Sequence, residues 1–476
     1  MNFGRDVIFT DEKIIDGSNV VRELEKAFTT HLVNRNRIQE LYDVYRNKTA
    51  VLNKTKTVRE DINNIVSENR ANEFVNFYKG YVLGEPIQYI RRENSRDEKD
   101  DDRTAQNINA LNSVMSDADK AACDIDMFEW QLICGVSYRL VVSTNQMPFG
   151  IFSLDPRNTF VVYANTVYKQ PLMAVTYINK TETLEPYFSV YTATEYFEVY
   201  NGRIVSYAPH YLGDIPIVEY PLNNSRQGII ELVISLLDAI NTIDSNRVDD
   251  VVQFVNSFLA LVGGDIDEET YEKLNRFKML CMPSGVDAKY LSAPLTQGDI
   301  QTLKDDLYKA ALTICGIPNR NGGTSTSDTG SAVIMRDGWQ DAERRAKSME
   351  TMFKKSEKGF LRIALRILRN TEHITLDLKD IEIHFTRRNY ENIASKSQVL
   401  ISMLNCDKIA DELAFSSCGM FADPESAYLQ SKAEYENNIT GNQMSNVQEK
   451  TDGLTGNGGN KVSQVQENPL SEQQRE

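Results

Sequence analysis

The apolar residues near the start of the chain follow helical spacing. Leu24 and Phe28 lie about one helical turn apart, and a second helical stretch runs from Ile62 to Leu83. The charged run from Ser95 to Arg103 contains no apolar residue, so we expect a solvated loop there and a helix over about 107–130 after it. The first quarter of the chain is therefore predicted to be mostly helical.

Short runs of β-branched and aromatic residues replace this pattern as far as about Pro221. Turn residues such as Asn201-Gly202 separate the runs. The runs are Val136–Val142, Phe160–Tyr163, Met173–Ile178, Tyr187–Tyr191 and Tyr196–Tyr200. Their length and spacing predict an antiparallel, β-rich segment.

Two long helical patterns follow, and they are separated by a short insert. The first covers 229–262, with Ser225 as its candidate N-cap, and its apolar residues occupy more than the single stripe of a surface helix. The second begins near Thr296 and ends where Gly316 and Pro318 stop it. The chain is thus expected to run out along one helix, form a small α-β-β insert and return.

A polar loop and a third long helix come next. Residues 319–330 consist largely of Gly, Ser, Thr and Asn, which predicts a mobile loop. Residues 331–369 predict a long basic helix, and a strand pair (374–378 with 381–386) and short helices (391–434) follow it. The tail from about residue 438 lacks aromatic residues and is predicted to be disordered.

The composition narrows the class of protein. A hydrophobic content of 41% over 476 residues is enough for two or three folded domains, and the net charge of −16 argues against sequence-independent wrapping of duplex DNA. The six cysteines form no C-x-x-C pair, the first 20 residues contain no apolar signal-peptide core, and no apolar run is long enough to cross a membrane. We expect a reduced protein that does not cross a membrane.

No motif for catalysis is present. The Gly-rich loop lacks the lysine of a phosphate-binding P-loop, and the four histidines lie in separate segments. Acidic pairs such as Asp124 with Asp126 and Asp249 with Asp250 are more typical of solvated or helix-capping residues than of a metal site. The sequence therefore predicts no enzyme, no cofactor and no metal.

Several motifs carry a resemblance to a known family. They are the segments 69–78 with 84–87, 154–163, and 213–220 leading to 236–241, with Ser245 four residues further on. Together with the order helix, insert, helix, loop and long helix, they make residues 30–435 similar to the portal proteins of tailed bacteriophages. The resemblance is to the branch found in long-tailed phages of Gram-positive hosts.

The resemblance implies an α+β portal fold with an α/β wing, a two-helix stem, a small α-β-β clip, a long kinked helix after a tunnel loop, and a helical crown. Carried over segment by segment, the wing corresponds to 1–225 with 371–388, the first stem helix to 226–262, the clip to 263–294, the second stem helix to 295–318, the tunnel loop to 319–330, the long wing helix to 331–370, the crown to 389–437 and the disordered tail to 438–476.

The resemblance also implies partners. Portal proteins form a ring, commonly of twelve subunits, at the capsid vertex of the virion, after assembly in the host cytoplasm. The ring conducts double-stranded DNA during packaging and ejection, docks the terminase and later the head-tail adaptor, and meets the major capsid and scaffold proteins.

Three groups of residues are candidates for these contacts. The tunnel-loop group, expected to meet DNA, is Asn319, Arg320, Asn321, Thr324, Ser325, Thr326, Ser327 and Asp328. The clip group, expected to meet the terminase and adaptor, is Asp267, Glu268, Glu269 and Glu272. The stem group, expected to pack against neighbouring subunits, is Val233, Leu236, Leu237 and Ile240. An excess of acidic residues in the first stem helix, namely Glu231, Asp238, Asp244, Asp249 and Asp250, would suit a tunnel wall along which DNA slides.

Alternatives remain open at this stage. A coiled-coil scaffold would explain the long helices but not the β-rich segment, and a DNA-processing enzyme would need converging carboxylates. The basic residues of 331–369 suit either phosphate contact or pairing with acidic residues of a neighbouring subunit. Arg320 is either a solvated side chain or a DNA contact.

Overall fold

The computed structural model describes residues 4–57, 60–92, 98–143, 147–181, 183–255, 258–262, 287–291, 297–319, 338–386, 393–421, 424 and 427–435. The chain divides into two compact units, Met1–Arg388 (unit 1) and Asn389–Glu476 (unit 2). The boundary falls where the expected crown begins. Helices and strands alternate through unit 1, which makes the fold mixed α+β, as predicted.

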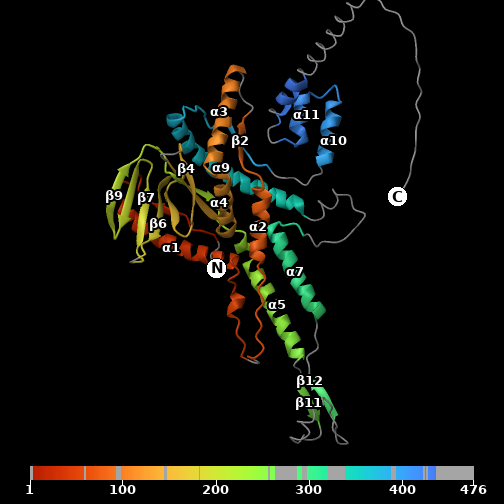
Figure 1. The fold of residues 1–476 in the computed structure, drawn as a ribbon. Helices are drawn as coiled ribbons and strands as arrows, with labels where there is room; N and C mark the ends of the chain where they lie inside the picture. The colour runs from red at the N-terminus through yellow and green to blue at the C-terminus, as the bar shows by residue number, and fades with distance from the viewer. Residues whose placement is uncertain are drawn as a thin grey trace, which may run out of the picture. The chain divides into compact units, whose positions relative to one another are not determined.

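A six-stranded sheet in the order β1-β5-β6-β7-β8-β9 forms one part of unit 1 (Figure 1). Its strands are β1 (Ile8–Thr10), β5 (Thr159–Ala164), β6 (Pro171–Asn179), β7 (Pro186–Tyr191), β8 (Glu195–Tyr200) and β9 (Arg203–Pro209). All neighbours pair antiparallel except β1 with β5. Helix α1 (Val20–Tyr45) packs its buried side, including Val20 and Leu24, on Val175, Val190 and Phe197 of this sheet. The predicted antiparallel segment is confirmed.

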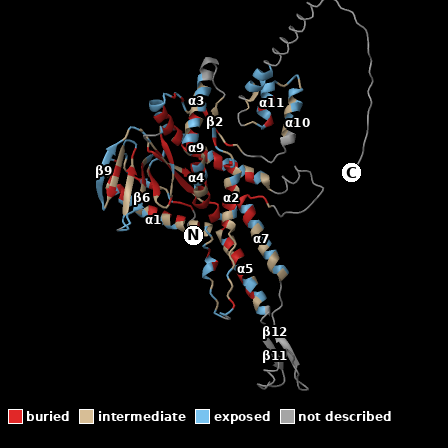
Figure 2. Cartoon of the chain, viewed as in Figure 1, coloured by how far each residue is buried: buried red, intermediate tan, exposed pale blue. Residues whose placement is uncertain are grey.

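A larger core lies around a three-stranded sheet in the order β10-β3-β4. These strands are β3 (Val136–Val142), β4 (Gly150–Leu154) and β10 (Ile217–Pro221), and they pack with α4 (Lys120–Cys134) and α9 (Trp339–Thr371). Buried residues gather here, whereas β9 at the sheet edge is exposed along its whole length (Figure 2). Gly135 turns the chain from α4 into β3 with a φ of +83°, and a Cβ there would lie 2.3 Å from the carbonyl oxygen of Arg226, so only glycine fits.

Charged side chains lie inside this core and join its elements. Arg139 of β3 and Glu357 of α9 are fully buried, and Lys120 and Asp124 of α4 complete the cluster. The Arg139 guanidinium also lies over the rings of Tyr220 and Phe360. Two cations and two anions balance one another, which satisfies the requirement that buried charges be paired.

The helical first quarter differs from the prediction at two places. Helix α2 (Arg70–Val82) is capped by the side chain of Asn69, which accepts a hydrogen bond from the amide of Asn72 at 3.2 Å. The expected single helix over 107–130 is two helices, α3 (Glu98–Asp117) and α4, because Asp119 at a φ of 51° breaks it. The expected solvated loop was also wrong in part, since helix α3 begins within it.

The long helices are shorter than predicted. Helix α5 spans Ile234–Val255, and a single 3-10 turn, Ile230–Leu232, precedes it. Beyond it, Phe258–Val262 forms strand β11, which pairs antiparallel with β12 (Asp287–Leu291), so the prediction of helix as far as residue 262 was wrong. Apolar, β-branched residues favour a strand where a partner strand is available. The return helix α7 spans Gln297–Cys315.

The predicted strand pair 374–378 with 381–386 was also wrong. Only Ile381–His384 forms a strand, β13, and it pairs antiparallel with β2 (Gln88–Arg91) from far away in the sequence. In unit 2, α10 (Ile393–Leu404) and α11 (Asp411–Cys418) pack on each other, with Ala414, Phe415 and Cys418 buried.

Candidate functional site: the α5–α7 pair and its strap

Helices α5 and α7 lie side by side (Figure 1). Polar side chains join them. The guanidinium of Arg247 on α5 donates to the side-chain oxygens of Gln297 at 2.5 Å and Gln301 at 2.6 Å, both on α7. Lys304 of α7 donates to Asp244 of α5 at 2.8 Å. These contacts fix the two helices against each other along their length.

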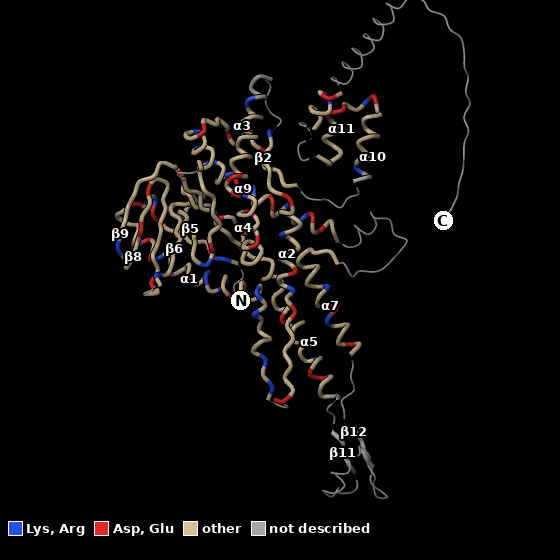
Figure 3. Tube along the Cα trace, viewed as in Figure 1, with Lys and Arg blue, Asp and Glu red and all other residues tan. Residues whose placement is uncertain are grey.

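A third segment completes this pair. Residues 49–57 and 60–69, which we call the strap, run along α5 (Figure 1), with lysines in the first limb close to the acidic residues of α5 (Figure 3). Glu68 of the strap accepts a hydrogen bond from Lys304 at 2.6 Å, so that one ammonium group joins the strap, α5 and α7. The strap therefore packs beside α5 and α7, where only the two helices were expected.

A ladder of three polar side chains on α5 holds the strap. Asn241, Ser245 and Asp249 follow one another at four-residue intervals and are almost fully buried. Their side-chain oxygens accept hydrogen bonds from alternate strap amides, those of Glu68 at 2.8 Å, Val66 at 3.0 Å and Asn64 at 2.6 Å respectively.

The spacing of this ladder has a simple geometric basis. Four residues of helix rise about 6 Å, and two residues of extended chain advance about 6.6 Å. Every fourth helical residue therefore meets every second strap amide. The ladder satisfies backbone groups that would otherwise be buried without partners.

Asp249 is the most heavily bonded member of the ladder. Its carboxylate also receives the ammonium groups of Lys54 at 2.6 Å and Lys56 at 2.5 Å, and the side-chain amide of Asn64 at 2.9 Å. Burial alone would raise the pKa of Asp249, but the hydrogen bonds from Lys54, Lys56 and Asn64 outweigh it and hold the pKa well below its usual range. Asp249 is thus ionised and serves to bind the strap.

The stem residues expected to meet a neighbour are instead turned inward. Val233, Leu237 and Ile240 are buried in the core of their own chain, and Leu236 is partly buried against that core. These residues join the large core formed with residues of α2, α4 and α7. This placement corrects the expectation that they are free to contact another subunit.

Other apolar residues of the pair face outward. Val248 and Val251 of α5 are 38% and 43% exposed, and Leu303 and Ile314 of α7 are 52% and 41% exposed. Leu303 and Ile314 lie eleven residues, or about three turns, apart and therefore share a face of α7. The sequence showed their apolar character but not their exposure.

Fewer acidic residues are free to line a tunnel wall than expected. Glu231 is buried and paired with Arg5, Asp244 with Lys304, and Asp249 with Lys54 and Lys56. Among the five acids of this stretch, Asp250 is exposed and Asp238 is half-buried. The excess of acidic residues thus serves mainly to bind basic residues of the same chain.

The ladder was only partly visible in the sequence. Asn241 and Ser245 belonged to the motif that carried the family resemblance, whereas Asp249 was interpreted as a solvated or tunnel-wall acid. Polar residues at i, i+4 and i+8 within a helix rich in apolar residues are the signal that indicates a buried polar face. That signal says nothing about which segment, almost two hundred residues earlier, fills it.

Most of the other predicted contact residues lie outside the described residues. This holds for Asp267, Glu268, Glu269 and Glu272 of the clip group and for the tunnel-loop group from Arg320 to Asp328. Asn319 is described, and it lines a cavity of about 410 Å³ together with Phe77, Tyr308 and Leu312. The cavity lies where α2 and α7 meet.

Some basic residues of α9 pair with acids of their own chain. Arg344 contacts Asp341 at 2.7 Å, Lys347 contacts Glu343 at 3.5 Å, and Arg369 contacts Asp377 at 3.5 Å. The sequence alone favours either phosphate groups or acidic residues of a neighbouring subunit as partners of these basic residues. These surface pairs provide a third explanation for part of its charge, although each contributes less than about 1 kcal/mol.

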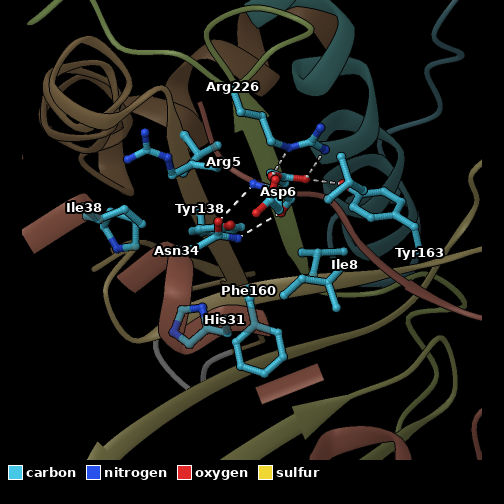
Figure 4. Close-up of a pocket in the computed structure, with 15 residues that line it drawn as sticks. Arg5, Asp6, Ile8, His31, Asn34, Ile38, Tyr138, Phe160, Tyr163 and Arg226 are labelled. Atoms are coloured by element: carbon cyan, nitrogen blue, oxygen red, sulfur yellow. Dashed lines mark hydrogen bonds and ion pairs between the residues drawn. The ribbon is translucent and has the colours of Figure 1, made fainter. Parts of the chain in front are cut away.

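A second polar cluster, near the N-terminus, does not form a ligand site. Arg226 donates to Glu219 at 2.9 and 3.0 Å, and Asp6 and Asn34 exchange hydrogen bonds at 2.9 Å (Figure 4). The cavity between these residues measures about 10 Å³, roughly the space of one water molecule. The cluster ties the N-terminal segment to α1 and β10.

The described residues contain neither a membrane-spanning helix nor a metal-binding cluster. No helix among the described residues is long and apolar enough to cross a membrane. Within the same residues, no group of three or more His, Cys, Asp or Glu side chains is arranged to hold a metal ion.

Comparison with known families gives one match. A family model described as "Phage portal protein, SPP1 Gp6-like" matches residues 24–441. This range includes most of unit 1, with α5, α7 and the strap, and the described part of unit 2. No curated protein matches the chain.

Proposed function

This chain belongs to the phage portal protein family, SPP1 Gp6-like, and from that premise we propose that its α5–α7 pair builds the wall of a ring-shaped DNA channel. Proteins of this family are structural channel subunits and not enzymes. They belong to the capsid of the virion, where they act in genome packaging and capsid assembly. The match over residues 24–441 is the observation that carries the proposal.

We propose a closed ring in which α5 of one subunit packs on α7 of the next. A ring requires two different complementary surfaces on each subunit. The exposed pair Val248 and Val251 on α5 and the exposed pair Leu303 and Ile314 on α7 provide such surfaces. Twelve subunits, the typical number in the family, is the stoichiometry we propose. Unit 2 would then form the crown, and assembly would take place in the host cytoplasm.

We also propose that residues 263–294 form the clip, which docks the terminase during packaging and the head-tail adaptor afterwards. The support comes from the position of this segment in the sequence, between α5 and α7, and from its acidic residues Glu268, Glu269 and Glu272. Residues 319–330 would line the tunnel, and the wing would meet the major capsid and scaffold proteins. The sequence motifs favour the branch of long-tailed phages of Gram-positive hosts.

The ring is tested by its mass and shape. Native mass spectrometry and negative-stain images of the purified chain should show closed rings with a central hole. Rods would support a coiled-coil scaffold, and compact monomers at high concentration would contradict the channel.

The clip is tested separately. Reversing Glu268, Glu269 and Glu272 to lysine should leave rings intact and weaken their association with the terminase of the same virus. Reversal of three exposed acids elsewhere, Glu25, Glu185 and Glu372, is the control. Equal terminase binding by both triple variants would remove the clip assignment while leaving the channel standing.

A further inference from the structure

The outer face of the six-stranded sheet has four tyrosines around one carboxylate. Tyr187 on β7 pairs across the strands with Tyr200 on β8, and Tyr191 pairs in the same way with Tyr196. Glu198 lies between the two pairs, directly opposite Ser189. The opposite face of the same strands, with Val190, Phe197 and Val199, is buried against α1.

One tyrosine pair already binds a cation of the same chain. The ammonium group of Lys180 lies 4.2 Å from the ring centre of Tyr200 and 4.8 Å from that of Tyr187. A cation at this distance from an aromatic face is attracted by the ring quadrupole. This half of the face therefore shows which chemistry the tyrosines accept.

The other pair offers the same chemistry, without a cation from the part of the chain that the structure describes. The rings of Tyr191 and Tyr196 lie 4.8 Å apart, and no lysine or arginine of the described residues lies over them. The Tyr196 hydroxyl donates to Glu198 at 2.9 Å and the Tyr187 hydroxyl at 2.7 Å, and these hydrogen bonds hold the Glu198 pKa below its ordinary value. Glu198 is thus a negative charge beside a half-buried tyrosine pair.

An apolar groove adjoins the pair formed by Tyr191 and Tyr196. Its volume is about 430 Å³, and Tyr191 and Tyr196 form one wall, while Tyr211, Leu212 and Ile367 form others. Tyr211 is 91% exposed, an unusual degree for a side chain of this size. Glu198 accepts a hydrogen bond from Tyr196 in the wall of this groove, so the surface suits an apolar side chain next to a basic one.

We propose that this surface binds a segment of the coat protein that carries a lysine or arginine beside an apolar side chain. The basic group would lie over Tyr191 and Tyr196 next to Glu198, and the apolar side chain would fill the groove. The inference rests on the proposed channel function, because it is the ring at the vertex that brings this surface to the shell. Within unit 1 the sheet lies on the side away from α5 and α7, the side that faces outward in a ring lined by those helices (Figure 1).

Charge decides between a protein segment and DNA as the occupant. Glu198 is an acid of this face, and the whole chain has a net charge of −16, so phosphate would be repelled. A basic protein segment is attracted by the same charges. Electrostatic complementarity of this kind determines partner choice more than total affinity.

The experiment measures binding of purified coat protein of the same virus to assembled rings by biolayer interferometry. Tyr196→Ala should raise the dissociation constant about tenfold, since it removes an aromatic ring and one apolar wall of the groove. Glu198→Lys should raise the dissociation constant at least as much. Tyr196→Phe keeps the ring, so its dissociation constant should stay within about threefold of that of the unchanged chain. Tyr200→Ala is the matched control, because it removes a tyrosine of the pair that Lys180 occupies, and it should change binding by less than about twofold.

Ring formation is checked for each variant by negative stain, so that a failed ring is not mistaken for failed binding. If the unchanged chain makes no rings, the channel function fails. If its rings form but Tyr196→Ala and Glu198→Lys bind coat protein as well as Tyr200→Ala does, only the present proposal is overturned. Preferential binding of the scaffold protein or of duplex DNA at this face would overturn it as well.

Discussion

Arg139 on β3 donates a hydrogen bond to Glu357 on α9 across 2.8 Å, and both side chains are fully buried. Lys120, Tyr89 and Tyr220 also contact the Glu357 carboxylate, at 3.0, 2.6 and 2.7 Å. This carboxylate therefore connects α9 to the β10-β3-β4 sheet. A buried charge bonded from four elements fixes the position of α9 and tolerates little displacement.

Removing this charge should destabilise unit 1. Glu357→Gln is expected to lower the free energy of unfolding by about 3–5 kcal/mol at pH 7, because Arg139 and Lys120 lose the charge that compensates their burial. Urea unfolding followed by tryptophan fluorescence provides the measurement. Glu382→Gln, on an exposed position of β13, is the control and should change stability by less than about 0.5 kcal/mol.

The effect should depend on pH in a defined direction. Burial alone would raise the pKa of Glu357, but the charges of Arg139 and Lys120 and the hydroxyls of Tyr89 and Tyr220 lower it to about 2. A lowered pKa means that the stabilising contribution is complete above the ordinary value near 4.5 and is lost as the pH falls toward 2. The difference between Glu357→Gln and the unchanged chain should therefore shrink between pH 5 and pH 3. A difference that grows over this interval would show that the carboxylate is not ionised in the folded chain.

The strap supplies a second prediction. Asp249→Asn should lower the stability of the α5–α7 region by about 3 kcal/mol, because two lysines and one backbone amide lose a buried carboxylate. Asp250→Asn, one residue further along and exposed, is the matched control. Limited proteolysis within residues 50–66 should accelerate in the first variant only. Equal proteolysis of both variants would mean that Asp249 does not hold the strap.

The two kinds of stem residue allow assembly to be separated from folding. Leu303→Asp places a charge on a half-exposed position, so the subunit should fold normally, while ring assembly should be impaired because an unpaired charge in an apolar interface costs several kcal/mol. Leu184→Asp, an equivalent change at an exposed turn between β6 and β7, should leave rings intact. Leu237→Asp, in the core of the chain, should prevent folding itself. Normal rings from Leu303→Asp at all concentrations would contradict the proposed interface.

Local patterns predicted the strands and most helices, since these depend on neighbouring residues. The runs that form β5 to β8 were recognisable from alternating aromatic and β-branched residues. By contrast, residues 258–262 were predicted as helix because an apolar run of that length has no distinctive period, and β12 decides its conformation. The pairing of β13 with β2 was missed for the same reason, as the partner lies almost three hundred residues away.

The site was predictable in its helices but not in its surfaces. Leu237 and Leu303 are equally apolar in the sequence, yet one is buried and the other half-exposed. The difference arises from tertiary packing, because Leu237 joins the core formed with α2 and α4, whereas Leu303 lies on the outer face of α7. Nothing within the helices themselves shows which segment will cover them.

The last prediction concerns residues 319–330, proposed to line the tunnel. Their hydroxyl and amide groups can contact phosphates without sequence preference, and Arg320 adds one full positive charge that Asp328 partly offsets. One such contact is weak and sensitive to salt, but a ring repeats it around the axis, so that duplex DNA could be steadied while it slides. Deleting Gly322–Ser327 should leave rings and empty shells normal while reducing the amount of DNA packaged and retained, measured by nuclease-protected DNA per particle. Removing an equal number of residues from the tail, 460–465, is the control and should not change packaging. Packaging and retention equal to those of the unchanged protein would exclude the tunnel role of this loop, and the channel assignment would then rest on α5 and α7 alone.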